Sequence, residues 1–378
     1  MQLILSLDYE VFGNGAGDVM QDIIQPTNRI LSICDRHDAK MTIFFDVGEY
    51  WAFEQYDSQL REELGYSPYE QMKKQVTNAI HRGHDIQLHL HPQWIGAEYK
   101  NGTWKLCNLY WRLADLPDGL GNIDQIKSIT GALYKGKQTL ESMIKPVKTD
   151  YVCSCFRAGG FYNQPSRNII SAMKKIGLKA DSSVVKGYKI NTPFEVDYSY
   201  VETEKVVWWT TDTEFTKEGL PGENIIELSI SSKMEPYWKN FKKTKLRATL
   251  KRWRTEKASR RNHNSNEKIS SVPDYYSVLK KLLKKCPSIF DYCKLSSKDM
   301  LRRIKEHTKY QKQPIVMIGH SKDFINDSEL DGFLDSLCKT ENVTFQNMSE
   351  YVQKEISSLD ISSSRKSDRL GLGLPTIK

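Results

Sequence analysis

The chain has 378 residues, of which 39% are hydrophobic and 11% aromatic, enough for one large domain or two ordinary ones. Its mean hydropathy is -0.57, and no uninterrupted apolar run approaches the roughly 18 residues of a membrane-spanning helix. The net charge of +8 is concentrated, because the segment from Lys239 to Lys268 holds twelve Lys and Arg residues and two Glu residues. The remaining residues together are close to neutral, so the body of the protein is not basic.

The first ten residues do not form a secretory signal, because Asp8 and Glu10 interrupt the apolar run. They predict a β-strand instead. The seven cysteines are an odd set without the spacing of a disulfide framework. Cys153 and Cys155 lie two apart, which is neither a redox motif nor half of a zinc ribbon. We therefore expect free thiols in a reducing cytoplasm.

Strands and helices alternate along the chain, which favours a parallel α/β sheet or barrel. Strands are expected at 3–7, 41–47, 85–91, 179–185 and 314–320, and helices at 27–37, 69–82, 167–176 and 298–309.

Two connecting segments, 95–150 and 190–300, are longer than ordinary βα connections and are expected to be elaborations on a smaller core. The tail 357–378 is rich in Ser, Lys, Arg and Gly, and is expected to be disordered. The sequence thus predicts one domain over residues 1–356.

Polar residues with metal-ligand chemistry follow several expected strands, at the edge where parallel α/β proteins build their sites. Asp8 and Glu10 end the first strand and share a face, because side chains alternate along a strand. His89 and His91 do the same two strands later. Other strand ends carry Asp181 and His320, and Arg157 precedes the Gly159–Gly160 pair.

This set suits hydrolysis by a metal-activated water. Two imidazoles and one carboxylate leave open positions on a divalent ion, typically zinc. A second carboxylate can take the proton of the water, and a separate histidine can protonate the leaving amine. Arg157 could keep the base ionised, and the glycines allow backbone N–H groups close to a developing oxyanion.

Five segments, in order, resemble the motifs of the polysaccharide deacetylase (NodB-homology) family. They are S-L-D-Y-E, G-H-D-I-Q-L-H-L-H-P, R-A-G-G-F, A-D-S-S and V-M-I-G-H-S. The resemblance spans most of the chain but is anchored on about 40 residues. It implies an α/β fold, a distorted (β/α)7 barrel with long insertions, and metal-dependent removal of acetyl groups from N-acetylated sugars.

Carried over residue by residue, the resemblance makes Asp8 the general base, paired with Arg157. It makes His320 the general acid, oriented by Asp181, and His89 a metal ligand. The oxyanion donor would be Gly160 or Phe161.

Two positions depart from the family pattern. Tyr9 stands where the family has a metal-binding Asp, and strand periodicity transfers that role to Glu10. Gln93 stands where the family has its second metal histidine, and the same periodicity points to His91 instead. Metal identity, and ligation by Asp8 or Gln93, stay open.

Within 239–268, Leu246, Leu250 and Trp253 recur at helical spacing among basic residues. This is typical of a helix lying on an anionic membrane surface, although a solvated loop fits equally well. No nucleic-acid recognition fold is visible. Tryptophans in 95–150 and at 208–209 suit either sugar stacking or core packing.

The sequence therefore predicts a cytoplasmic zinc hydrolase, at the inner face of the membrane if the basic segment binds there. Its expected substrate is an N-acetylated sugar, lipid- or nucleotide-linked, used in surface polysaccharide biosynthesis. Two alternatives stay open: hydrolysis of another non-peptide C–N bond, and a catalytically inactive glycan-binding or scaffold protein on the same fold.

Overall fold

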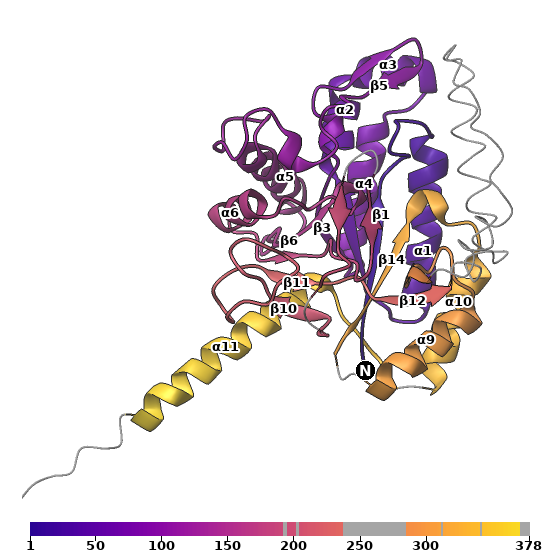
Figure 1. Cartoon of the computed structure of the whole chain (residues 1–378). Coiled ribbons are helices and arrows are strands. Elements are labelled where there is room, and N and C mark those ends of the chain that lie inside the picture. Colours follow the sequence, from indigo (N-terminus) through magenta and orange to yellow (C-terminus); the bar gives the residue numbers. More distant parts are fainter. Residues whose placement is uncertain (192–194, 202–203, 237–284, 311–312, 341, 371–378) are drawn as a thin grey trace, which may run out of the picture.

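The computed structural model describes residues 1–191, 195–201, 204–236, 285–310, 313–340 and 342–370. It has a mixed α/β fold in which a curled, mostly parallel sheet forms a half-barrel with helices packed around its outside (Figure 1). Within these described ranges, parallel strands follow one another in the order β11-β7-β6-β3-β2-β1-β14. The expectation of a parallel α/β protein is confirmed.

The parallel strands are β1 (Gln2–Tyr9), β2 (Met41–Asp46), β3 (Asp85–Leu90), β6 (Cys155–Ala158), β7 (Ala180–Asp181), β11 (Ile226–Leu228), β14 (Ile315–His320) and the short β15 (Thr344–Phe345), which pairs with β1. The antiparallel strands are β10 (Val207–Trp209), which pairs with β11, and the pairs β4 (Glu98–Lys100) with β5 (Thr103–Lys105), β8 (Lys189–Ile190) with β9 (Val196–Asp197), and β12 (Ser232–Pro236) with β13 (Lys285–Ile289). The α-helices of the described residues are α1 (Gln25–Arg36), α2 (Val47–Gln55), α3 (Asp57–Leu64), α4 (Pro68–His81), α5 (Ile129–Ile144), α6 (Arg167–Ile176), α9 (Ser297–Tyr310), α10 (Asp327–Thr340) and α11 (Met348–Leu370).

The two faces of β1 have different chemistry. Leu3, Leu5 and Leu7 belong to the larger apolar core, which also contains residues of the surrounding helices. Ile4 belongs to a second, smaller core with residues of α11. The alternation places Asp8 in the same row as Ile4. The inside of the half-barrel is therefore apolar at the amino end of β1 and polar at its carboxyl end.

Backbone hydrogen bonds outside the regular ladders curl the sheet towards closure. The N–H of Ser231, shortly after β11, donates to the carbonyl of Val316 in β14 at 3.0 Å. On its other side Ser231 accepts from the N–H of Phe290 at 2.9 Å, and Phe290 in turn accepts from the N–H of Ile318 at 3.0 Å. These bonds bring the β11 and β14 ends of the sheet together.

Local signals explain where the predicted helices begin and end. Ser67 accepts from the N–H of Glu70 at the start of α4, and Pro68 at the first helical position has no N–H that would need an acceptor. Gly177 ends α6 in the left-handed conformation with φ +80°. The four helices expected from the sequence are present as α1, α4, α6 and α9, each within two residues of the expected ends.

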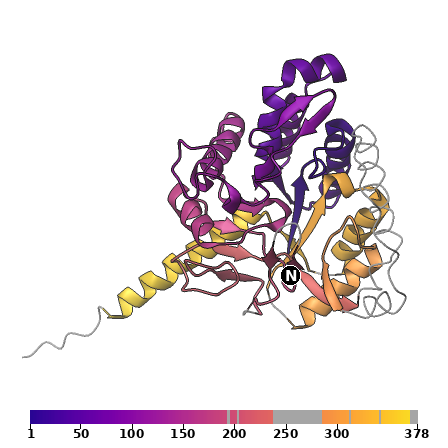
Figure 2. The same cartoon turned by 45° about the horizontal axis from the view of Figure 1, so that its top comes forward.

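The C-terminal segment differs from the expectation. Helix α11 runs from Met348 to Leu370, past the boundary at residue 357 where the sequence predicts disorder, and it projects from the body of the molecule (Figures 1 and 2). Its first turns pack Met348, Tyr351 and Val352 into the smaller core. Once packing has formed the first turns of a helix, each further residue adds a hydrogen bond at little cost in free energy. The composition of the tail does not show that its preceding residues are packed in this way. The basic segment 239–268 lies outside the described residues.

All seven cysteines lie in described parts of the chain and are unpaired, as the sequence predicts. Cys153 and Cys155 are buried, and burial raises the pKa of Cys153 to about 12, which makes its thiol unreactive. No described helix combines the length and the apolar character that crossing a membrane requires.

Candidate metal centre and active site

The strand ends bring the expected site residues together at one edge of the sheet. Because the strands are parallel, their register aligns Asp8 of β1 with His320 of β14, and His89 of β3 with Arg157 of β6. Asp46, the last residue of β2, is aligned with His89. Residues far apart in the sequence are thus placed side by side.

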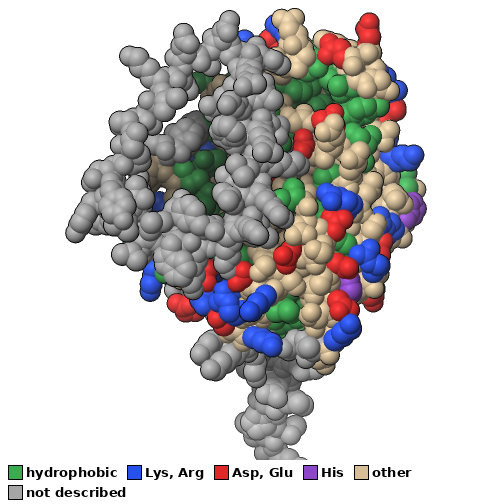
Figure 3. All heavy atoms as spheres, turned by 90° about the vertical axis from the view of Figure 1, so that its right-hand side faces the viewer, with side chains coloured by type: hydrophobic (Ala, Val, Ile, Leu, Met, Phe, Trp, Pro, Cys, Tyr) green, Lys and Arg blue, Asp and Glu red, His purple; other side chains and the backbone are tan. Residues whose placement is uncertain are grey.

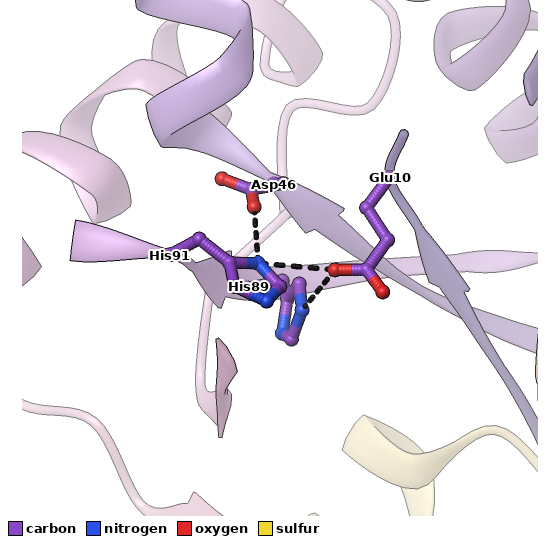
Figure 4. Close-up of side chains that lie close together, drawn as sticks. All are labelled: Glu10, Asp46, His89 and His91. Atoms are coloured by element: carbon purple, nitrogen blue, oxygen red, sulfur yellow. Dashed lines mark hydrogen bonds and ion pairs between the residues drawn. The ribbon is translucent and has the colours of Figure 1, made fainter. Parts of the chain in front are cut away.

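Four buried side chains form a cluster that could hold a metal ion. Glu10, Asp46, His89 and His91 each offer one ligand atom, and these atoms all lie within 4.8 Å of one another. Glu10 Oε2 lies 3.2 Å from His89 Nε2 and 3.0 Å from His91 Nδ1, and Asp46 Oδ2 lies 2.6 Å from the same Nδ1 atom. Figure 4 shows these four side chains converging from three strand ends.

The cluster is held by hydrogen bonds to its surroundings. His89 Nδ1 donates to the carbonyl of Arg157 at 2.8 Å, which orients the ring so that Nε2 is directed at Glu10. Asp46 Oδ1 accepts from the N–H groups of Gly48 and Glu49 at the start of α2. Both interactions are of the kind that orients metal-binding side chains.

Electrostatic interactions within the site favour the ionised form of Glu10 and the protonated form of His91. Burial alone would raise the pKa of Glu10, but Lys322 and His91 lower it well below its ordinary value. Burial would lower the pKa of His91, yet Glu10 and Asp46 raise it well above its ordinary value. A divalent cation would have to displace the proton that His91 shares with these carboxylates.

Arg157 fixes Asp8 beside the cluster. The Arg157 side chain is fully buried, and its Nη1 donates to Asp8 Oδ1 at 2.6 Å. Its other donors bind Ser6 and Ser182, and its guanidinium lies over the ring of Phe44 at 4.0 Å. Burial would raise the pKa of Asp8, but Arg157, together with His89 and His320, outweighs it and the pKa lies below its ordinary value. Asp8 is therefore held as a carboxylate.

His320 lies across from this carboxylate. Its Nε2 is 3.6 Å from Asp8 Oδ2 and 3.9 Å from Glu10 Oε1. Burial lowers the pKa of His320, although Asp8 acts in the opposite direction. Among the described residues, the Nδ1 atom of His320 has no hydrogen-bond partner.

The expected contact between Asp181 and His320 is not found among the described residues. Asp181 instead accepts from the backbone N–H and the hydroxyl of Ser183. It is aligned with Glu227 of β11, and burial and Asp181 together raise the pKa of Glu227 well above its ordinary value. The reason is the sheet order, because β11 follows β7 and separates it from β14. Asp181 and Glu227 form a buried carboxyl pair in place of the predicted orienting contact.

Neither of the two positions that depart from the family pattern belongs to the cluster. The Tyr9 hydroxyl donates to Gln75 on α4, in the larger core. Gln93 is fully buried, with neither side-chain amide atom hydrogen-bonded within the described parts of the chain. His91 takes the position in the cluster that strand periodicity assigned to it.

The sequence missed four charged residues around the site. Asp46 ends a predicted strand, the signal that identified Asp8, and could have been found in the same way. Glu227 is a charged residue inside the apolar stretch 225–230, which is itself a signal. Nothing in the sequence around Lys322 or Glu49 indicated that they lie near the site. Lys322 Nζ lies 2.6 Å from Glu10 Oε1, and Glu49 accepts from the N–H of Val11.

A cavity of about 320 Å³ opens onto these groups. Asp8, Glu10, His91, His320 and Lys322 line it. The turn after β6 lines it as well, and at Gly160 and Phe161 this turn has positive φ values of +59° and +65°. The cavity therefore reaches both candidate proton-transfer groups, part of the metal cluster and the backbone of the predicted oxyanion site.

The outer walls of the cavity come from elaborations on the barrel. Trp111 belongs to the segment 95–150, whereas Ile190 and Ile289 belong to 190–300. Trp104 of the first elaboration and Trp94, which precedes this segment, pack against Phe53 instead. Of these tryptophans, Trp111 is the one that lines the cavity.

No protein-family model matches the sequence, and no curated protein matches it. Solved structures are similar over most of the chain. A protein from Mycobacterium smegmatis, provisionally assigned as a polysaccharide deacetylase, is 11% identical over 94% of this chain and 90% of its own, with a TM-score of 0.44. Puue allantoinase is 10% identical over 93% of this chain and 89% of its own, with a TM-score of 0.45.

A 4-alpha-glucanotransferase from Thermococcus litoralis is 11% identical over 94% of this chain and 40% of its own, with a TM-score of 0.47. Because these identities are so low and the TM-scores lie below 0.5, neither the family nor the function of this chain follows from the likenesses. The functional assignment has to come from the side chains of the site.

Proposed function

We propose that this protein is a metal-dependent hydrolase that removes an N-acetyl group from a sugar. The observation that carries the proposal is the buried Glu10–Asp46–His89–His91 cluster, which lies beside an ionised Asp8 and a facing His320. A carboxylate, an imidazole and a metal-ligand set around one cavity are the parts that amide hydrolysis needs.

The donor set fits a transition metal, and zinc is our assignment. Imidazole nitrogens and a small number of carboxylate oxygens suit zinc, whereas calcium and magnesium prefer sites built from oxygen alone. His89 is held by the carbonyl of Arg157 so that its Nε2 faces the cluster. When bound, the ion would supply Lewis acidity, which makes water a stronger acid and polarises an amide carbonyl.

Asp8 and His320 divide the proton transfers. Asp8, kept ionised by Arg157, accepts a proton from the water whose oxygen bonds to the amide carbon. His320 in its protonated form donates to the amide nitrogen as the C–N bond breaks, giving acetate and an amine. The 3.6 Å between Asp8 Oδ2 and His320 Nε2 lets both groups reach one small reacting centre.

The turn after β6 is the proposed oxyanion site. Gly160 and Phe161 line the cavity with positive φ values, so the backbone rather than a side chain comes close to the reacting carbonyl. A backbone N–H there could stabilise negative charge on the carbonyl oxygen.

The cavity favours a single sugar ring over a long stretch of polymer. Its volume of about 320 Å³ is at the small end of ligand pockets. Trp111, Tyr162 and Tyr188 supply aromatic faces on which a sugar ring can stack. A lipid or nucleotide carrier would extend outside, in keeping with a role in surface polysaccharide biosynthesis.

Hydrolysis of another non-peptide C–N bond would use the same groups, so the substrate distinguishes it. A catalytically inactive glycan-binding protein would keep the cavity but need no metal. Tyr9 and Gln93, which replace metal-binding residues of the family pattern, favour this reading.

The proposed roles are tested by Asp8→Asn and His320→Ala. Each should lower acetate release from an N-acetylated sugar by about 10²- to 10⁴-fold. His37→Ala, which removes an imidazole paired with Asp331 outside the site, is the matched control. Acetate release that survives either substitution would refute these roles. Hydrolysis of a different amide, with no acetate release, would favour the other C–N bond.

A further inference from the structure

The two oxygens of the Glu10 carboxylate have different partners. Oε2 faces both imidazoles of the cluster, at 3.2 Å from His89 Nε2 and 3.0 Å from His91 Nδ1. Oε1 faces the ammonium of Lys322 at 2.6 Å. One oxygen is thus directed at the candidate metal position, and the other is engaged by a cation of the protein itself.

Lys322 is held firmly in this position. Its side chain is 6% exposed, and its Nζ also donates to the carbonyl of Val11 at 2.7 Å. The preceding residue, Ser321, donates to the carbonyl of Glu10 at 3.4 Å. The segment after β14 therefore hydrogen-bonds both to the main-chain carbonyls of Glu10 and Val11 and to the side chain of Glu10.

We propose that Lys322 is a positioning residue that determines which metal the cluster accepts, by restricting Glu10 to a single ligand oxygen. The inference depends on the metal centre of the proposed function. With Oε1 held by Lys322, Glu10 would offer one oxygen to the ligand set, which suits the low coordination number that zinc prefers. Ions that favour octahedral, oxygen-rich sites, such as Mn²⁺, would gain from a carboxylate that can offer both oxygens.

The experiment measures zinc and manganese affinity in competition with a chromophoric chelator, on the full chain after metal removal. Lys322→Met frees Oε1, and the ratio of Mn²⁺ to Zn²⁺ affinity should rise by about tenfold or more. Loss of a positive charge strengthens binding of both divalent ions alike, so the ratio isolates the effect of coordination. Lys322→Arg retains a cation and should keep the wild-type ratio.

Lys294→Met is the matched control. Lys294 lines the same cavity, but its Nζ binds Asp291 and Asp323, each at 2.9 Å, rather than Glu10. Its removal should leave the affinity ratio unchanged. If Lys322→Met does not fold, Lys322→Gln provides a neutral side chain that can still donate a hydrogen bond to the main chain.

An affinity ratio within twofold of wild type in the neutral Lys322 variants would overturn the inference, even though the metal centre itself would stand. An equal change in Lys294→Met would overturn it too, because the effect would then be one of general charge. Wild-type protein that binds neither ion would refute the metal centre of the proposed function, a result distinct from both.

Discussion

Asp46 links the metal cluster to a helix through the two oxygens of one carboxylate. Oδ1 accepts from Gly48 N at 2.8 Å and so caps the start of α2. Oδ2 lies 2.6 Å from His91 Nδ1. The position of His91 is therefore tied to the position of α2.

Gly159 shows how closely the turn after β6 approaches the cluster. A Cβ atom at this position would lie 2.5 Å from His91 Cδ2, so Gly159→Ala should displace the imidazole. We expect metal affinity to fall by about 10- to 100-fold, measured with the chelator competition described above.

Gly332→Ala is the control for this substitution. The nearest atom to a Cβ there is Ser297 Oγ at 3.5 Å, an ordinary contact, and alanine suits the helix α10 better than glycine. This variant should bind metal like wild type. Unchanged metal affinity in Gly159→Ala would show that His91 is not a ligand.

At the scale of single residues, the sequence located those that combine a reactive side chain with a strand end. Asp8, His89, His91 and His320 were found in this way. Lys322 was not, because its importance comes only from its distance to Glu10. The role predicted for Asp181 failed for a similar reason, since sequence does not show that β11 lies next to β7.

At the scale of secondary-structure elements, β1, β2 and α11 show why only one end of the half-barrel interior is polar. Ile4 and Phe44 on β1 and β2 belong to the smaller core that α11 completes, whereas Asp8 and Asp46 end the same strands. The strands β1, β2, β3 and β14 were expected from their short, largely apolar segments, and strand periodicity placed Asp8 and Glu10 on one face. Helices α2, α3 and α5 were not foreseen, and α2 is hydrophobic around most of its circumference, which hides helical periodicity.

Asp85 connects β3 to the start of α11 and makes that contact sensitive to pH. Its carboxyl group accepts from Gln87 Nε2 at 2.8 Å and from Ser349 N at 3.3 Å. Burial raises the pKa of Asp85 from 3.8 to about 6. The folded state therefore favours the protonated form, and the stability this provides is fully present below pH 3.8 and lost as the pH rises through 6.

Asp85→Asn should remove this dependence. Between pH 4 and pH 7 the free energy of unfolding of wild type should fall by about 2–3 kcal/mol relative to the variant. Urea unfolding of both proteins at the two pH values measures the difference. Parallel pH profiles would contradict the raised pKa of Asp85.

For the whole molecule, the described surface does not account for the net charge of +8. On the face shown in Figure 3, Lys and Arg side chains are interspersed with Asp and Glu side chains. Ion pairs such as Arg29–Asp327 and Arg36–Asp331 join α1 to α10 at the surface. The excess positive charge belongs to 239–268, as the sequence indicates.

We predict that this basic segment binds anionic membranes. Neutralising six of its Lys and Arg residues should abolish co-sedimentation with vesicles containing phosphatidylserine, since each basic residue contributes about 1 kcal/mol near such a surface. Metal content and acetate release should not change, because none of the described residues that form the candidate site belongs to this segment. Co-sedimentation that persists in the neutralised variant would refute this prediction.

The parallel α/β architecture was predictable because strands and helices alternate in the sequence. The joining of the β11 and β14 ends was not, because it depends on isolated backbone bonds of Ser231 and Phe290, which have no side-chain signature. The cavity walls were equally hidden, since Trp111 and Ile289 come from separate elaborations.

The most direct test of the central claim is to measure metal content and acetate release together, on wild type and on the double variant His89→Ala/His91→Ala. We predict about one zinc ion per wild-type chain, as expected for a single catalytic site, and acetate release from an N-acetylated sugar. Both should be lost in the double variant while the fold is retained. Acetate release by a metal-free wild type, or zinc retained in the double variant, would contradict the account.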